Sequence, residues 1–385
     1  MAVFADGFIE AYVGPQELGA ADNLEQVIID FINEAEKTLD VAVQEIDSMP
    51  IAEALIAARW RGLNVRVFLE QAYVTQNKLP TVSVRDGETF EEARHRAQWE
   101  DVATEKNNKV NRDILRVLLR NRVDVKVDFN PKIFHQKFII RDFRGGTNPK
   151  SAVLSGSTNF TTTGTHENLN HIVIFNHVGV CRRYRSEFDE IREGNFGVFG
   201  RRKRTYPKTV NSAGVPVRIL FAPDDFPELE FVKQMLKCKQ RLDFAIFTFS
   251  GSSGVDDALI MLRQANRAIR GVFDPLQGGQ WWSASNWLHE HGIDVFLPDA
   301  GRFPGKFNKL HHKLLVVDEA IVVAGSMNYS APANEFNDEN IFVIGNPFDL
   351  DEDEGGPVDH AKCAEIARFF RNEIDRIIAL SKPFQ

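Results

Sequence analysis

Two histidines, each followed at fixed spacing by a lysine and an aspartate, are the residues of this chain best suited to chemistry. The two sets share the pattern His-x-Lys-(x)4-Asp and consist of His135, Lys137 and Asp142, and of His311, Lys313 and Asp318. A Gly-Ser-x-Asn tetrapeptide follows each set, at 156–159 and at 325–328. The chain therefore carries one arrangement of an imidazole, an ammonium, a hydroxyl and an amide twice.

This combination of groups suits the cleavage of a phosphodiester. A nucleophile must approach phosphorus from one side while a proton donor serves the leaving oxygen on the other. Two imidazoles can fill both roles, because their ordinary pKa lies near neutrality. The charge on the phosphate oxygens requires donors already in place. The candidate donors are the ammonium groups of Lys137 and Lys313, the amides of Asn159 and Asn328, and the hydroxyls of Ser157 and Ser326.

A hairpin is expected to position each set. In the second set, residues 314–317 and 321–324 are two short apolar runs joined by a turn, which is typical of paired strands. Alternate residues of a strand share a face, so His311 and Lys313 project the same way, whereas His312 points to the other side. A buried hairpin with polar ends would explain either copy alone. The duplication favours a site built from both.

The rest of the chain repeats as well. Near-twin strands are expected at 39–46 and 242–249, and each is followed by the same alternation of helices and strands. Such alternation indicates an α/β fold with a sheet covered by helices on both faces. We expect a first lobe at 1–200, a linker at 201–216 and a second lobe at 217–385. Each sheet is expected to be mixed and mostly parallel.

Two segments fall outside the repeat. The linker contains the basic run Arg201–Arg204, which would either contact a phosphate backbone or act as a solvated connector, and we favour the connector. An insertion at about 75–111 in the first lobe is rich in charge of both signs. It is interpreted as an exposed helical excursion, with a surface insertion favoured over a lid.

Composition narrows the class of protein. The net charge of −8 argues against a wholly basic surface, although a local basic cleft remains compatible with it. The three cysteines have neither disulfide-framework nor zinc-site spacing, and no apolar run reaches the length of a membrane span. The first residues lack the pattern of a secretory signal, so a cytoplasmic location is expected. No carboxylate cluster suggests a metal site, and no cofactor is expected.

The duplicated motif resembles that of the phospholipase D superfamily, known as the HKD motif. The second copy follows the full pattern, including six residues between Asp318 and Gly325; the first has thirteen residues at the same place, where a longer turn is expected. The resemblance implies two tandem lobes related by a pseudo-twofold axis, with the motifs meeting at their interface. It also implies metal-independent cleavage of phosphodiesters through a covalent phosphohistidine, in a site that one chain can build.

The resemblance suggests roles for the residues. By the habit of the family, His135 is the expected nucleophile and His311 the general acid, although symmetry alone leaves the choice open. Each imidazole needs a partner on its other ring nitrogen, and Glu167 and Glu339 are the candidates. The aspartates of the motif, Asp142 and Asp318, are interpreted as structural, because they end the hairpin strands far from the histidines.

Three functions compete for the substrate. An aromatic residue follows each Gly-Ser-x-Asn, which is similar to the compact nuclease branch of the superfamily and favours DNA or RNA. A phospholipase D acting on phospholipid head groups is the alternative, and a resemblance to cardiolipin synthases is not expected without membrane helices near the start. A non-catalytic nucleic-acid-binding protein is the remote third, because both motifs are intact.

Overall fold

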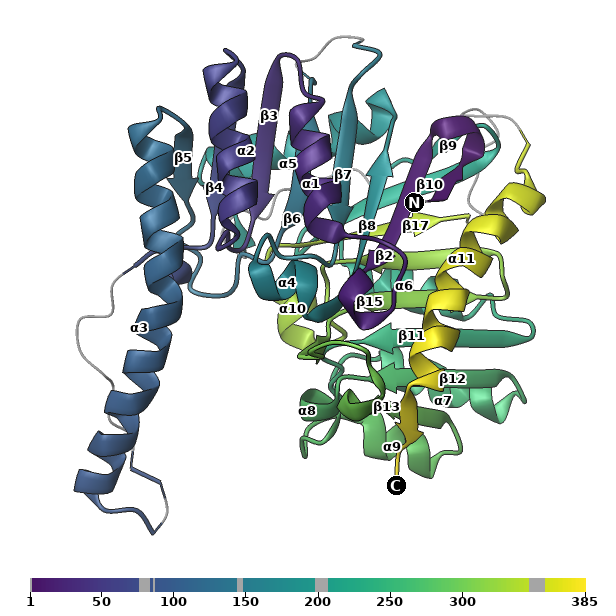
Figure 1. Ribbon diagram of the computed structural model, residues 1–385. Coiled ribbons are helices and arrows are strands. Elements are labelled where there is room, and N and C mark those ends of the chain that lie inside the picture. The colour runs from purple at the N-terminus through teal and green to yellow at the C-terminus, as the bar shows by residue number, and fades with distance from the viewer. Residues whose placement is uncertain (1, 76–83, 86, 144–147, 198–206, 346–356) are drawn as a thin grey trace.

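The computed structural model of the protein describes residues 2–75, 84–85, 87–143, 148–197, 207–345 and 357–385, without the side chains of 97–107. These residues form two nine-stranded sheets, one built mainly from each half of the chain, and helices cover both (Figure 1). Eight strands of the first sheet come from the first half, and the ninth is β14 (Lys309–Leu310).

The first sheet belongs to the first half of the chain. Its strand order is β1 (Ala2–Phe4), β2 (Ile9–Gly14), β8 (Asn168–Phe175), β7 (Ala152–Gly156), β6 (Lys137–Arg141), β3 (Thr38–Val43), β4 (Asn64–Leu69) and β5 (Asp124–Val127). One face packs on α1 (Leu24–Asn33), α2 (Met49–Trp60) and the end of α3 (Phe90–Arg120). The other face packs on α5 (Val178–Arg192). Alternate residues of β6 enter the two cores, as the period of a strand requires.

The second sheet repeats this plan. Its order is β18 (Ser381–Pro383), β13 (Asp294–Pro298), β12 (Ala268–Phe273), β11 (Arg241–Ile246), β15 (Lys313–Val317), β16 (Ile321–Gly325), β17 (Glu339–Ile344), β10 (Val215–Ala222) and β9 (Val210–Ser212). The outer face packs on α6 (Pro227–Met235), α7 (Val255–Gln264) and α9 (Ala284–Glu290). The inner faces of both sheets share one core with α5 and with α11 (His360–Ala379), so the lobes are joined by apolar packing.

Both sheets are mixed, as predicted, but the expectation that they are mostly parallel is wrong. Parallel pairing occurs in β3–β4–β5 and β11–β12–β13, where helices make the crossovers, and between β14 and β8. The motif strands β6–β7–β8 and β15–β16–β17 run antiparallel. Between β15 and β16 the connection is the short turn 318–320, which can join only antiparallel neighbours.

Of the two segments outside the repeat, the structure describes most of the insertion but not the basic run of the linker. The insertion contributes most of α3, whose first half extends away from the lobes (Figure 1). Its end is anchored to the first lobe, since the Asn111 side chain accepts a hydrogen bond of 3.1 Å from the backbone of Ile46. The run Arg201–Arg204 lies outside the described residues, whereas 210–216 already belongs to the second sheet through β9 and β10.

The lobes also exchange backbone hydrogen bonds where their motifs meet. The short strand β14 (Lys309–Leu310) of the second half pairs in parallel with the start of β8 in the first sheet. A bridge between Phe134 and Asp338 makes the reciprocal contact. Three short helices lie near this seam, α4 (Thr162–His166), α8 (Pro275–Gly278) and α10 (Ala331–Glu335).

Candidate active site

Each motif histidine is placed by the backbone of the opposite lobe. The N–H of His135, just before β6, donates to the carbonyl of Asp338 at 2.9 Å. The N–H of His311, just before β15, donates to the carbonyl of Leu169 at the same distance. The two rings therefore face each other across the seam, with centroids 6.4 Å apart and planes inclined by 74°. The motifs meet as the repeat predicted.

The opposite lobe also supplies the partner of each ring, and here the halves differ. Nδ1 of His135 lies 2.7 Å from Oε2 of Glu339, as expected of a carboxylate that holds an imidazole. Nδ1 of His311 lies 3.0 Å from Oδ1 of Asn170 and 3.1 Å from the carbonyl of Ser157. Both acceptors require a proton on Nδ1, so Nε2 of each ring is left for the reaction.

Glu167 contacts neither histidine, and its prediction as an imidazole partner is wrong. Its carboxylate binds Lys306 at 2.9 Å, just beyond α4. The sheet register explains the error, because Gly156 pairs with Ile172 and Gly325 with Ile341. Counting back two residues in each strand makes Asn170, not Glu167, the counterpart of Glu339.

The serines of the motif hold these partners in place. The hydroxyl of Ser326 donates to Oε2 of Glu339 at 2.7 Å, and that of Ser157 donates to Oδ1 of Asn170 at 2.8 Å. Both serines are fully buried. Each hydroxyl has a single proton, which it donates to these partners here, and phosphate binding by Ser157 and Ser326 stays a prediction.

Two buried lysines bring positive charge to the seam. Nζ of Lys137 donates to the carbonyl of His135 at 2.9 Å, and Nζ of Lys313 donates to that of His311 at 2.8 Å. Burial lowers the pKa of Lys137 to about 7 and that of Lys313 well below its ordinary value. A bound anion would favour the charged forms again, which is the behaviour required of phosphate ligands.

Burial also lowers the pKa of both imidazoles. It lowers the pKa of His135 to about 4, although Glu339 opposes the shift. It lowers the pKa of His311 well below the ordinary value, and the charges of Lys313 and Lys137 act in the same direction. No carboxylate opposes the shift at His311 in the way that Glu339 does at His135.

The two asparagines lie at the entrance in different settings. Oδ1 of Asn328 accepts from the backbone N–H of Thr248 at 3.3 Å, and the Nδ2 protons of Asn328 take no part in this contact. Nδ2 of Asn159 donates to Oε1 of Glu45 at 3.1 Å. Glu45 was missed by the sequence analysis, although it ends the first of the two near-twin strands at the position where the second has Thr248.

Asp142 and Asp318 bind backbone rather than the site, in agreement with their predicted structural role. The carboxylate of Asp142 accepts from the N–H groups of residues 36–38 before β3. That of Asp318 accepts from residues 239–241 before β11. Each aspartate therefore ties the motif hairpin to the neighbouring strand.

A second pair of histidines lies behind the site. His312, directed away from His311 as predicted, stacks on His171 with planes inclined by 5°, and both are fully buried. Nδ1 of each ring lies 3.1 Å from that of the other. The pseudo-equivalent place holds Asn340 and Gln136, whose side chains share a hydrogen bond of 2.7 Å. Each pair joins the two lobes, and in the described part of the chain neither pair forms a hydrogen bond to the imidazole of His135 or His311.

Among the residues that the structure describes, no group of three or more histidine, cysteine, aspartate or glutamate side chains is arranged to hold a metal ion. Within the same residues, no helix has the length and apolar character needed to span a membrane.

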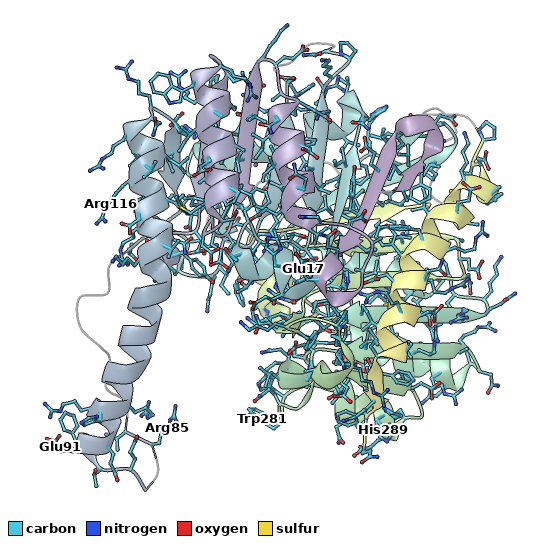
Figure 2. The ribbon with its side chains drawn as sticks, in the orientation of Figure 1. Glu17, Arg85, Glu91, Arg116, Trp281 and His289 are labelled. Carbon is cyan, nitrogen blue, oxygen red and sulfur yellow. The ribbon has the colours of Figure 1, made fainter. Side chains whose placement is uncertain are left out.

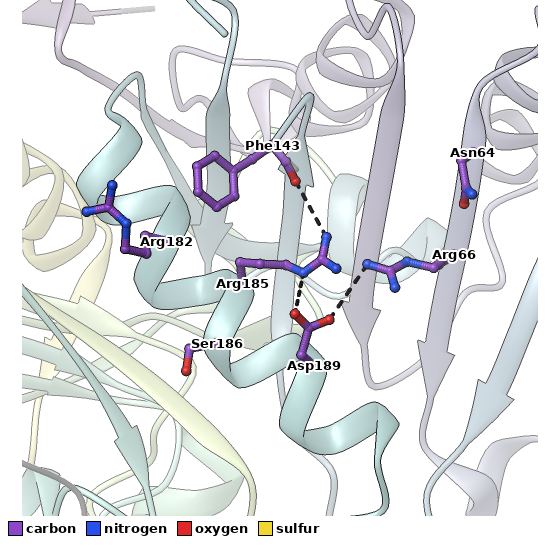
Figure 3. Close-up of a pocket in the computed structure, with 7 residues that line it drawn as sticks. All are labelled: Asn64, Arg66, Phe143, Arg182, Arg185, Ser186 and Asp189. Atoms are coloured by element: carbon purple, nitrogen blue, oxygen red, sulfur yellow. Dashed lines mark hydrogen bonds and ion pairs between the residues drawn. The ribbon is translucent and has the colours of Figure 1, made fainter. Parts of the chain in front are cut away.

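A pocket of about 690 Å³ lies at the other end of the first sheet (Figure 3). Its arginines point inward from β4 and α5, but they are largely paired. Arg66 and Arg185 both bind Asp40 and also approach Asp189. The pocket adjoins Asn64 at the start of β4, whereas the motif histidines meet the opposite ends of the strands. This cluster mainly stabilises the packing of α5 on the sheet.

The curated relatives that the chain matches include cardiolipin hydrolases and phospholipases D. The chain is 30% identical over 110 residues to mitochondrial cardiolipin hydrolase of Xenopus laevis, covering 29% of this chain and 49% of that protein. It is 33% identical over 96 residues to phospholipase D of Rickettsia conorii, covering 24% and 45%. The chain thus spans about half the length of the curated relatives that it matches.

A solved structure and a family model cover more of the chain. Phosphatidylserine synthase of Haemophilus influenzae superposes with a TM-score of 0.61 at 11% identity, covering 100% of this chain and 88% of that one, and so shares its fold. A family model described as "Cardiolipin synthase, PLD-like domain" matches residues 28–192 and 231–353, so the expectation of no resemblance to cardiolipin synthases is wrong for this domain. The match covers most of both lobes, and the chain belongs to this PLD-like domain family of the phospholipase D superfamily.

Proposed function

We propose that the chain is a phosphodiester hydrolase that works through a covalent intermediate on His135. The observation that carries the proposal is the pair of facing imidazoles, each held through Nδ1 by a residue of the opposite lobe. This arrangement leaves Nε2 of one ring for attack on phosphorus and Nε2 of the other for proton transfer to the leaving oxygen.

The partners of the two rings support the assignment of roles. Attack by Nε2 of His135 forms the P–N bond as the bond to the leaving oxygen breaks, and the phosphorylated ring becomes positively charged. The carboxylate of Glu339 at Nδ1 stabilises that charge. His311, held by an amide, enters as the acid and gives its Nε2 proton to the leaving oxygen.

The second half of the reaction reverses these roles. His311, now neutral, takes a proton from water as the water oxygen attacks phosphorus, and the P–N bond to His135 breaks. The protonated His311 and the free His135 are thereby restored. Lys137, Lys313, Asn159 and Asn328 stabilise the charge on the phosphate oxygens in both steps. The negative phosphate also favours the protonated form of His311, which burial alone disfavours.

A nucleic-acid substrate remains the interpretation favoured by the motif sequence. It rests on the aromatic residue that follows each Gly-Ser-x-Asn. In the structure Phe160 and Tyr329 are buried in the cores of their lobes, so these rings hold the loop and do not stack on a base. The nuclease proposal therefore depends on the general phosphodiester chemistry rather than on these two rings.

A phospholipid substrate has a specific observation in its favour. Exposed apolar side chains lie in both lobes, on the segment between β5 and His135 and on the segment that contains α8. Phe129 and Ile133, just before His135, are 75% and 47% exposed. In the second lobe Leu276 is 67% and Trp281 93% exposed, and Trp281 stands out from the surface (Figure 2). Such side chains are the kind that enter a lipid interface, and the relatives' names, cardiolipin hydrolase and phospholipase D, point the same way.

One panel of substrates tests the proposal. The purified protein in EDTA is incubated with single- and double-stranded DNA, RNA, and vesicles of cardiolipin or phosphatidylcholine. Cleavage of any of these, lost in His135→Asn, supports the hydrolase. Cleavage of vesicle lipids with nucleic acids untouched selects the phospholipase, and the reverse selects the nuclease. Activity that survives in the double variant His135→Asn, His311→Asn would overturn the two-histidine mechanism.

A further inference from the structure

Glu45 is a carboxylate inside the candidate site that the two-histidine mechanism does not use. It follows β3 and is partly exposed at the entrance. Its Oε1 accepts a hydrogen bond of 3.1 Å from Nδ2 of Asn159. Its other oxygen, Oε2, has no hydrogen bond to any residue in the described part of the chain.

A bound phosphodiester would meet this carboxylate directly. Asn159 and Lys137, the donors expected to hold the phosphate in the first lobe, are the groups that Glu45 contacts or faces. Two negative charges that share the same donors would repel each other strongly in a partly buried site. The repulsion disappears when the carboxylate takes up one proton, and the neutral carboxyl then offers a donor to the phosphate.

We propose that Glu45 is a further substrate-contacting residue, which binds the phosphodiester monoanion together with one proton. In the bound state Oε1 still accepts from Asn159, while the protonated Oε2 donates to a phosphate oxygen. The inference rests on the proposed function, since it places the phosphate of the substrate between the two motifs. The bound species is then the substrate anion plus a proton taken from solvent.

The groups around Glu45 are consistent with proton uptake near neutrality. Burial raises the pKa of Glu45 to about 7, and the nearby charge of Asp47 raises it further. Lys137 and Lys309 lower it, as does the hydrogen bond from Asn159. Tyr73, on the segment after β4, is the remaining titratable group that faces it. The counterpart in the second lobe is Thr248, which carries no charge, so only one side of the site has this device.

The test measures binding rather than turnover. Diethyl phosphate, a monoanion throughout the range used, is titrated by calorimetry between about pH 5.5 and about pH 8.5. The protein carries His135→Asn, which blocks turnover, and is compared with the same protein carrying Glu45→Gln in addition. Glutamine mimics the protonated glutamate, because its amide can accept from Asn159 and donate to the phosphate.

The ratio of the two affinities is the decisive quantity. We expect similar affinities at the lowest pH and at least about tenfold tighter binding by Glu45→Gln at the highest, because only the glutamate must gain a proton. Titration of Lys137 weakens binding in both proteins and does so at lower pH in Glu45→Gln, because the charge of Glu45 raises the pKa of Lys137, so the measured ratio is a lower bound on the effect of Glu45. Glu45→Ala, which has no donor, should bind about tenfold more weakly than Glu45→Gln throughout. Glu167→Gln removes a carboxylate outside the site and should leave the pH dependence unchanged.

A ratio that does not change with pH, or weaker binding by Glu45→Gln at high pH, would overturn the role of Glu45. Absence of binding in both proteins at every pH is a different result. It would overturn the proposed function of the site and, with it, the inference that rests on that function.

Discussion

The two halves of the site hold their histidines in the same way with different atoms. At His135 the opposite lobe provides the carboxylate of Glu339, fixed by the hydroxyl of Ser326. At His311 it provides the amide of Asn170, fixed by the hydroxyl of Ser157. Both partners accept the Nδ1 proton, but only the carboxylate neutralises a positive ring. On the proposed mechanism, equal placement with unequal charge gives the two copies of the motif their distinct roles.

Replacing the histidines should give the largest effects and should separate their roles. His135→Asn removes the nucleophile, so turnover should fall by at least about 10⁴-fold for every substrate. His311→Asn removes the acid, which matters most when the leaving oxygen needs a proton. Its loss should be about 10²-fold with bis(p-nitrophenyl) phosphate, whose leaving group is stable as an anion, and larger with an alkyl leaving group.

Steady-state rates with the two kinds of leaving group measure this difference. Mass spectrometry of His311→Asn should also detect phosphate on His135, because release of the intermediate is slowed. If His135→Asn, and not His311→Asn, shows the dependence on the leaving group, the two roles are exchanged.

Glu339→Gln makes the first half resemble the second and should have the next largest effect. The positive ring of the intermediate loses its counter-charge, so kcat should fall by about 10²-fold. Stopped-flow formation and decay of the phosphorylated enzyme measure the loss, with Glu167→Gln as a control that should retain full activity. A change of less than about threefold would show that the carboxylate is not needed.

Asn170→Asp makes the second half resemble the first and should act mainly on pH dependence. His311 must be protonated to act as the acid, and its pKa in the free protein lies below the ordinary value, so kcat/KM should fall as pH rises. A carboxylate at position 170 raises that pKa, and the fall should move upward by about one pH unit or more. A profile that stays in place in Asn170→Asp would contradict the assignment of His311 as the acid.

The motif aspartates should behave alike, because their contacts are alike. Asp142→Asn and Asp318→Asn each replace a carboxylate that accepts hydrogen bonds from three backbone N–H groups. Each should lower the free energy of unfolding by about 2 kcal/mol, with turnover nearly unchanged below the transition. Urea unfolding followed by circular dichroism measures the loss. A large fall in kcat of the folded variant would mean that the aspartate reaches the chemistry.

The sequence predicted the architecture because the repeat is strong. The duplicated motif and the near-twin strands sufficed to predict two α/β lobes, and the resemblance to the phospholipase D superfamily implied that the lobes meet at their motifs. The prediction that the sheets are mostly parallel was wrong, because the hydrophobic pattern of β6–β7–β8 does not reveal strand direction. The short turn at 318–320 requires antiparallel neighbours, whereas a longer connection such as 157–167, which contains α4, does not fix the direction of the strands that it joins.

Within the site, the sequence predicted the residues placed by local spacing but not those placed by the pairing of distant strands. The positions of His135, Lys137 and Asp142 depend on one strand and its turns, so the motif alone placed them. Asn170 and Glu45 depend on which residue of one strand lies opposite which residue of another. A shared Glu-Asn pair suggested Glu167, whereas the pairing of Gly156 with Ile172 shows that the matching position lies three residues later.

On the proposed mechanism, the reciprocal holding of the histidines makes catalysis depend on the contact between the lobes. His135 takes both its backbone acceptor and its ring partner from the second lobe, and His311 takes both from the first. A small separation would disable the two halves together while each sheet kept its own hydrogen bonds. Turnover would therefore be lost at a lower denaturant concentration than helix content, and a molecule wedged into the seam would inhibit without touching either imidazole.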